Sequence, residues 1–182
     1  MGRHCGYLAM ASAVAAGADA VLFREQGRSD SDIIDAVVEY VRGGFSSGKN
    51  RVLIIKSEGV EIPCTRLARE VSGRLEPELP GVDVRATVLG HVVRGGRPSY
   101  QDRMIAARLA YAALDLLGAG QTDEMVAWGP TVEGGSATGD PMVWHFPLDR
   151  VLEETAALLD GTSELTRWRV SMLEKLEGVL GL

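Results

Sequence analysis

The sequence predicts an α/β protein with a mostly parallel sheet and helices on both faces of that sheet. Three short apolar runs of strand length, residues 20–23, 51–55 and 82–89, alternate with longer segments whose apolar residues recur at helical spacing. Strands that alternate with helices are typical of βαβ units, whose neighbouring strands run parallel. In such sheets ligands bind beyond the carboxyl ends of the strands.

Two helices and a strand open the predicted order of elements. Residues 7–16 are rich in alanine, the strongest helix former, and predict a buried helix that ends at Gly17. A short strand follows over residues 20–23. Cap-type residues from Ser29 to Asp32 precede a helix that we expect to end at Gly43-Gly44. The apolar positions of this helix recur at helical spacing and are Ile33, Ile34, Val37, Val38 and Val41.

The middle of the chain repeats this alternation. The second strand, residues 51–55, is followed by a helix over 65–75, which two prolines bring to an end. The third strand, residues 82–89, leads into the sequence GHVVRGGR. The longest helix follows over residues 101–118, with alanines and leucines along one stripe.

The C-terminal part adds short strands and two helices. A fourth strand is predicted over 124–128, and residues 131–140, TVEGGSATGD, have the composition of a loop. Residues 141–148 form another short apolar segment. From Asp149 the chain is expected to be helical in two pieces that break at Gly161.

Composition excludes several classes of protein. The 182 residues are 46% hydrophobic and 24% charged, which predicts a packed soluble core. The net charge of -6 argues against a nucleic-acid-binding protein, because phosphate backbones are bound by basic faces. Cys5 and Cys64 have no CxxC spacing, so we expect reduced thiols in a cytoplasmic protein. No apolar run approaches the roughly 18 residues that span a membrane, and MGRHCGYLAM lacks the apolar core of a signal peptide.

Polar residues gather where the predicted strands end. Glu58 follows the second strand; His91, Arg94 and a glycine pair follow the third; and Gly2 and Arg3 precede the first helix. Arginine donates paired hydrogen bonds to phosphate, and glycines let backbone N–H groups approach it. A carboxylate accepts hydrogen bonds from sugar hydroxyls, so this set of residues favours a sugar phosphate over an apolar ligand. Each feature taken alone is more typical of a solvated surface loop or turn than of a site.

Three blocks of sequence resemble the 6-phosphofructokinase family, whose members use ATP or pyrophosphate. They are MGRHCGYLAMASAVAAGAD, the strand that ends in SEG, and RATVLGHVVRGGRPSYQDR with the helix after it. The similarity runs from Met1 to about Leu117 and corresponds to the C-terminal, sugar-phosphate-binding half of the family. It implies a fructose 6-phosphate-binding domain over residues 1–120 and a C-terminal segment, 121–182, that returns toward a nucleotide-binding domain.

The resemblance implies an activity and a role for each matching residue. The family transfers a phosphoryl group to the 1-hydroxyl of fructose 6-phosphate in glycolysis. Met1, Gly2 and Arg3 would line the sugar site, and Glu58 would bind sugar hydroxyls. His91 and Arg94 would hold the 6-phosphate. Arg85 would reach the sugar phosphate of a neighbouring subunit, which makes a homo-oligomer the expected state.

The family's donor half has no counterpart in these residues. Its glycine-rich ATP loop, its general-base aspartate and the acidic groups near Mg²⁺ lie upstream, and no GGDG-like or TIDND-like segment occurs here. We therefore expect no catalytic residue and no metal ligand in this chain, although the family implies Mg²⁺ with ATP or pyrophosphate. Phosphoryl transfer requires donor, metal and base in line, so the isolated chain should be inactive. A start codon placed too late, a truncated product or a partner chain that carries the missing half would each explain the difference.

Bacterial members of the family have an allosteric nucleotide site, which the resemblance places at Asp19 and Lys49. Ser47 stands where that site has an arginine, so regulation of this kind is weakly supported. Two other hypotheses stay open beside the phosphotransferase. One is a non-catalytic or regulatory protein that binds a sugar phosphate. The other is a fragment that folds poorly, with an exposed sheet edge and an uncovered apolar face.

Overall fold

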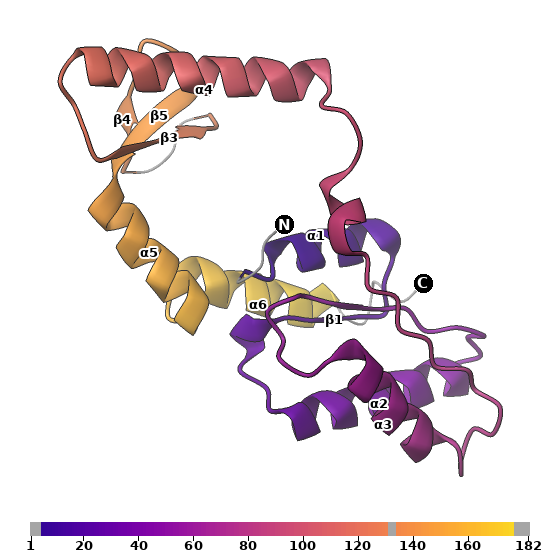
Figure 1. Ribbon diagram of the computed structural model, residues 1–182. Coiled ribbons are helices and arrows are strands. Elements are labelled where there is room, and N and C mark those ends of the chain that lie inside the picture. The colour runs from indigo at the N-terminus through magenta and orange to yellow at the C-terminus, as the bar shows by residue number, and fades with distance from the viewer. Residues whose placement is uncertain (1–4, 131–133, 177–182) are drawn as a thin grey trace. The chain divides into compact units, whose positions relative to one another are not determined.

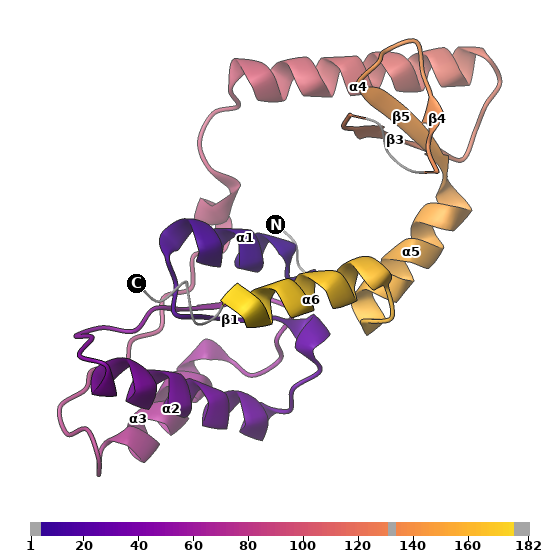
Figure 2. The same ribbon diagram turned by 180° about the vertical axis from the view of Figure 1, so that it is seen from behind.

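The computed structural model describes residues 5–130 and 134–176 (Figures 1 and 2). The chain divides into two compact units. The first comprises the residues up to Arg94 together with those from Leu158 onward, and the second is Gly95–Ala157. The predicted functional division at residue 120 concerns ligand binding and stays a prediction.

A parallel pair of strands forms the centre of the first unit. β1 (Ala20–Leu22) pairs with β2 (Ile54–Lys56), with Ala20 opposite Ile54, and α2 (Asp30–Ser46) makes the crossover between them. α1 (Tyr7–Ala16) packs against both strands, and α3 (Cys64–Leu75) packs against α2. This is the predicted βαβ arrangement, and it confirms the α/β class.

Alternate residues of β1 supply two separate hydrophobic clusters, because successive side chains of a strand point to opposite faces. Leu22 belongs to a cluster with the apolar residues of α2 and α3. Val21 belongs to a second cluster with Met10 and Ala13 of α1. Helices therefore cover both faces of this sheet, as predicted, and β1 lies between α1 and the α2–α3 pair in Figure 1.

The start of α2 confirms the predicted cap, and its end corrects the prediction. Asp32 N donates to Ser29 Oγ at 3.2 Å, and Ser29 N donates to the Asp32 carboxylate at 3.1 Å, which makes a capping box. The helix does not end at Gly43-Gly44 but runs on to Ser46. A glycine inside a helix costs only about 1 kcal/mol, and Phe45 packs against the core beyond it.

The predicted third strand is wrong. Residues 82–89 are extended but join no sheet, and the first unit has a two-stranded sheet within the described residues. Val84 packs against the α2–α3 cluster, whereas Val88 and Leu89 are exposed. The alternating pattern alone does not make a strand, since a strand also needs a neighbour with which to form ladder hydrogen bonds. The segment ends in a 3₁₀ helix, η2 (Gly90–Arg94).

The C-terminal helices break where the sequence predicts. α5 (Leu148–Asp160) and α6 (Glu164–Leu176) are separated at Gly161, whose φ of 80° suits glycine. α6 contacts η1 (Arg24–Gln26) of the first unit. Arg169 lies 4.8 Å from the centre of the Tyr7 ring, and Val170 packs against the α1 cluster.

The second unit is a helix on an antiparallel sheet. α4 (Tyr100–Gly118) packs against β3 (Glu124–Trp128) and β5 (Val143–Pro147). The strand order is β3-β5-β4, so the parallel arrangement is confined to the first unit. β4 (Ser136–Ala137) corrects the prediction of a loop over residues 131–140, of which 131–133 lie outside the described residues. Two residues are too few to show the alternation that marks a strand.

Candidate functional site

The predicted sugar-phosphate residues lie on three stretches of chain. Met1, Gly2 and Arg3 fall outside the described residues. Glu58 is an exposed residue in the turn that directly follows β2, which is the carboxyl end of that strand as predicted. Two hydrogen bonds to backbone carbonyls hold this turn: Ser57 N donates to Leu22 O at 2.8 Å, and the Lys56 side chain donates from Nζ to Val60 O at 2.7 Å.

His91 and Arg94 lie on the 3₁₀ helix η2, where both are exposed. A 3₁₀ helix has three residues per turn, so side chains three positions apart project from the same side. Gly90 and Gly95 bracket this turn with φ values of 54° and 75°, a conformation that glycine adopts without strain. The local structure therefore presents an imidazole and a guanidinium together to solvent, and both groups donate hydrogen bonds to phosphate.

Arg85 lies on the extended segment and is paired with a near neighbour. Its Nε donates to the Asp83 carboxylate at 2.6 Å, and both side chains are largely exposed. An exposed ion pair of this kind contributes at most about 1 kcal/mol, so the guanidinium is available to another partner at small cost.

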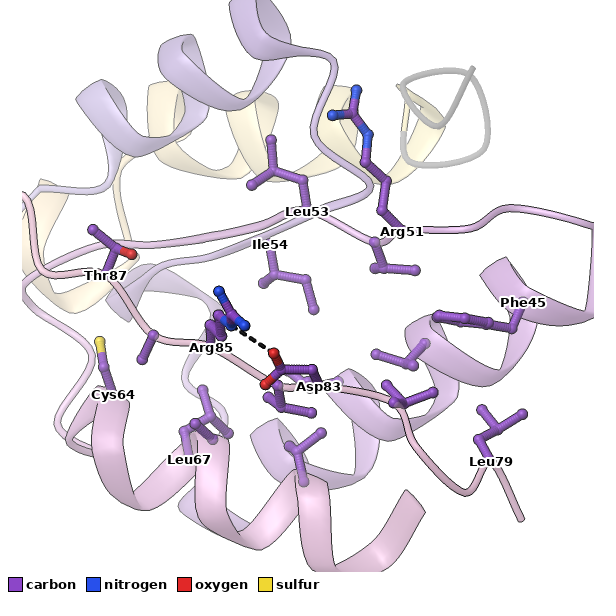
Figure 3. Close-up of a pocket in the computed structure, with 18 of the residues that line it drawn as sticks. Phe45, Arg51, Leu53, Ile54, Cys64, Leu67, Leu79, Asp83, Arg85 and Thr87 are labelled. Atoms are coloured by element: carbon purple, nitrogen blue, oxygen red, sulfur yellow. Dashed lines mark hydrogen bonds and ion pairs between the residues drawn. The ribbon is translucent and has the colours of Figure 1, made fainter. Parts of the chain in front are cut away.

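A cavity of about 790 Å³ is lined by the extended segment, by β2 and by residues of α2 and α3. In Figure 3, Asp83, Arg85 and Thr87 follow one another along the segment, and Ile54 lies across the cavity from them. Apolar side chains such as Phe45 line much of its wall.

The structure does not gather the predicted residues around one cavity. Glu58, Arg85, His91 and Arg94 all belong to the first unit, but only Arg85 lines the cavity beside β2. The reason is the missing strand: a segment that is not paired with β2 does not carry its following loop to the carboxyl end of β2. The convergence of these loops stays a prediction.

Asp19 and Lys49, the predicted effector residues, are brought together. Lys49 Nζ donates to Asp19 Oδ1 at 2.6 Å, and Leu53 N donates to Asp19 Oδ2 at 2.7 Å. Burial works to raise the pKa of the Asp19 carboxyl, but these two hydrogen bonds and the Lys49 charge outweigh it and lower the pKa below its usual value. The pair joins the loop before β1 to the chain before β2, so it has a structural role whether or not an effector binds.

Replacing Asp19 by asparagine is expected to lower the free energy of unfolding at pH 7 by about 1 kcal/mol, the value for a partly solvated charge-assisted hydrogen bond. The folded-state pKa of Asp19 lies below its unfolded value, so its contribution is full above the unfolded pKa and lost as the pH falls through the folded pKa. Urea unfolding of the wild type and Asp19→Asn at pH 7 and below pH 4 measures this. Asp83→Asn, at an exposed pair, is the control. An equal difference at both pH values would contradict the assignment.

The sequence does not reveal a polar cluster that the second unit contains. Arg108 donates from Nε to Asp140 Oδ2 at 2.6 Å and lies 4.4 Å from the centre of the Trp128 ring. His145 Nδ1 lies 3.0 Å from Glu124 Oε2. A hollow of about 580 Å³ is lined in part by Arg108, Asp140 and His145. The two pairs are separated by 32 and 21 positions and have no motif spacing, so no local signal marks them.

The part of the chain that the structure describes holds no group of three or more His, Cys, Asp or Glu side chains placed to bind a metal ion. No helix among the described residues is both long and apolar enough to cross a membrane.

The fold is that of an α/β protein, a class in which ligands generally bind at strand ends. The family model described as phosphofructokinase matches residues 1–117, and the chain belongs to the phosphofructokinase family. This match contains α1, β1, β2 and η2 and therefore every predicted site residue.

Curated relatives are similar over about two thirds of the chain. The ATP-dependent 6-phosphofructokinase of Natranaerobius thermophilus is 44% identical over 126 residues, which are 69% of this chain and 36% of the relative. That of Tolumonas auensis is 41% identical over 121 residues, 66% of this chain and 35% of the relative. The matched part thus spans about a third of the length of these relatives.

Solved structures show the fold over nearly the whole chain. Phosphofructokinase from Saccharomyces cerevisiae matches 98% of this chain with a TM-score of 0.72 and 21% identity, using 24% of its own length. Pichia pastoris phosphofructokinase in the T-state matches 99% of this chain with a TM-score of 0.70 and 21% identity, using 20% of its own length. At this identity the likeness shows the fold alone, and it confirms the phosphofructokinase-like, partial α/β class.

Proposed function

We propose that this chain is the sugar-phosphate part of an ATP-dependent 6-phosphofructokinase, which transfers a phosphoryl group from ATP to the 1-hydroxyl of fructose 6-phosphate. The observation that carries the proposal is the family match over residues 1–117, which contains the GHVVRGG turn and the SEG turn. The Natranaerobius and Tolumonas relatives are named as ATP-dependent enzymes, which supports ATP over pyrophosphate as the donor.

The proposed roles follow from the chemistry of each side chain. His91 and Arg94, on one side of an exposed turn, hold the 6-phosphate. The Glu58 carboxylate accepts hydrogen bonds from sugar hydroxyls. Arg85 forms only a weak, exposed ion pair with Asp83, and in a homo-oligomer it reaches the sugar phosphate of a neighbouring subunit. Met1, Gly2 and Arg3 complete the sugar site.

Donor binding and base catalysis belong to a different part of the enzyme in this proposal. Binding of ATP with Mg²⁺ and removal of the 1-hydroxyl proton are assigned to the family's donor half, whose GGDG-like and TIDND-like segments do not occur in these residues. The donor half then belongs either to a further part of the same protein or to a partner chain. The complete enzyme acts in glycolysis in the cytoplasm.

A turnover assay tests whether the donor site and the general base lie outside this chain. The 182-residue chain is incubated with ATP, Mg²⁺ and fructose 6-phosphate, alone and after co-expression with the N-terminal half of the Natranaerobius thermophilus relative. We expect ADP formation that depends on fructose 6-phosphate only from the co-expressed pair. Turnover by the chain alone would contradict the assignment of donor and base to another part. Selective binding without turnover in either case would favour the non-catalytic, regulatory alternative.

A further inference from the structure

The hollow in the second unit has no part in the proposed sugar-phosphate site. We call it the α4 hollow, because one wall is a face of α4; the other is the turn between β4 and β5, residues 137–141, with part of β5. In Figures 1 and 2 these strands lie along one side of α4. The turn lies beyond residues 1–117, which the family model matches. A volume of about 580 Å³ is within the range of small-molecule sites.

Hydrogen bonds fix the turn wall of the α4 hollow. Asp140 Oδ2 accepts from Arg108 Nε at 2.6 Å, and the Arg108 guanidinium lies 4.4 Å from the centre of the Trp128 ring. Thr138 Oγ1 donates to Val143 O at 2.7 Å across the turn. The wall is therefore held in place without a ligand, so binding loses little free energy to ordering it.

His145 gives the α4 hollow a hydrogen-bond acceptor. Its Nδ1 lies 3.0 Å from Glu124 Oε2, and the two side chains are 14% and 20% exposed. An ionised carboxylate only accepts hydrogen bonds, so Nδ1 carries the proton of the neutral imidazole, and Nε2 is then an acceptor. His145 lines the hollow, whereas Glu124 does not.

The charges at the α4 hollow favour a positive ligand. Arg108 is the lysine or arginine that lines it within the described part of the chain, and this cation is already paired with Asp140. Asp115 is an exposed carboxylate in the last turn of α4, where the helix dipole adds partial negative charge. An anion would meet Asp115 and would have to displace Asp140, whereas a cation meets acceptors.

We propose that the α4 hollow binds a small organic cation, an amine carried on a short apolar body. The ammonium donates hydrogen bonds to the Asp115 carboxylate and to His145 Nε2. Tyr111, which is 69% exposed at the edge of the hollow, covers the cation with its ring. Leu116 and Pro141, on opposite walls, contact the apolar body.

Three probes of one shape test the ligand class. The 182-residue chain is titrated at neutral pH with 2-phenylethylamine, with the neutral 2-phenylethanol and with the anion phenylacetate, and binding is followed by protein-observed NMR. We expect saturable binding of the amine with a Kd of about 1 mM, typical of a ligand of roughly ten heavy atoms. 2-Phenylethanol should bind roughly fivefold more weakly, the change that a partly exposed ion pair produces, and phenylacetate more weakly still.

Variants assign the binding to the α4 hollow. Asp115→Asn should weaken amine binding roughly fivefold and leave 2-phenylethanol binding unchanged. Tyr111→Ala should weaken amine binding about two- to fivefold through the lost cation–π contact. Both side chains are exposed, so the melting temperature should stay the same. Asp149→Asn removes an exposed carboxylate of the same unit outside the hollow and is the matched control, which should bind as the wild type does.

Several results would overturn the inference. Binding of 2-phenylethanol or phenylacetate as tight as that of the amine would exclude a cation site, and so would the absence of saturable amine binding. Equal losses in Asp115→Asn and Asp149→Asn would assign the binding to the overall negative charge of the chain. Normal amine binding in both Asp115→Asn and Tyr111→Ala would place the amine elsewhere.

Discussion

Replacing Arg94 by alanine is expected to weaken the binding of fructose 6-phosphate by about 10- to 100-fold. A charge-assisted hydrogen bond contributes about 1.5–3 kcal/mol, and each 1.4 kcal/mol changes affinity tenfold. Arg94 is exposed on η2, so its removal leaves the hydrophobic clusters untouched and the chain should unfold at the same temperature. Isothermal titration calorimetry of the folded variant measures the loss.

Two further variants separate charge from geometry at this position. Arg94→Lys keeps the positive charge but loses the planar fork, so its binding should lie between wild type and Arg94→Ala. Arg97→Ala removes an exposed arginine three positions further along, outside η2, and should bind normally. Binding in Arg94→Ala equal to that of the wild type would remove the turn from the sugar-phosphate site.

Leu22→Ala is expected to lower the free energy of unfolding by about 2–5 kcal/mol, the range for truncating a buried leucine. Leu22 is 0% exposed and belongs to the cluster that β1 shares with α2 and α3. The loss of its side chain leaves a cavity where these elements meet. Urea unfolding followed by circular dichroism gives the difference.

The control for this variant is Leu89→Ala. Leu89 is 60% exposed on the extended segment, and surface substitutions usually change stability by less than about 0.5 kcal/mol. An equal cost for both variants would mean that Leu89 is buried in solution, as it would be if residues 82–89 formed the strand that the sequence predicts.

Local signals predict the ends of several elements well. The Ser29 cap and the Gly17 stop depend only on residues within one turn, and both are found: Gly17 has a φ of 60° and caps α1. The two C-terminal helices and their break at Gly161 follow from the same kind of signal. Such features are fixed by the chain's nearest neighbours, so a single sequence is enough to find them.

Features that depend on residues far apart in the sequence cannot be predicted from local sequence patterns. Residues 82–89 have the alternating pattern of a strand. To form one, they would have to pair with β2, about 30 positions earlier, and the structure shows no such hydrogen-bond ladder. Arg108 forms an ion pair with Asp140, which is 32 positions later in the sequence, and neither residue belongs to a recognisable motif. The candidate residues on the SEG and GHVVRGG turns are found because a family resemblance carries long-range information that spacing alone does not.

Titration of the intact 182-residue chain with fructose 6-phosphate, with glucose 6-phosphate as the control sugar, decides whether this polypeptide forms a sugar-phosphate site. We expect saturable binding of fructose 6-phosphate and roughly tenfold or more weaker binding of glucose 6-phosphate, because Glu58, His91 and Arg94 would recognise the hydroxyls and the phosphate of one sugar together. Equal affinity for the two sugars, or no binding by a chain that unfolds cooperatively, would contradict the assignment of that site to this chain.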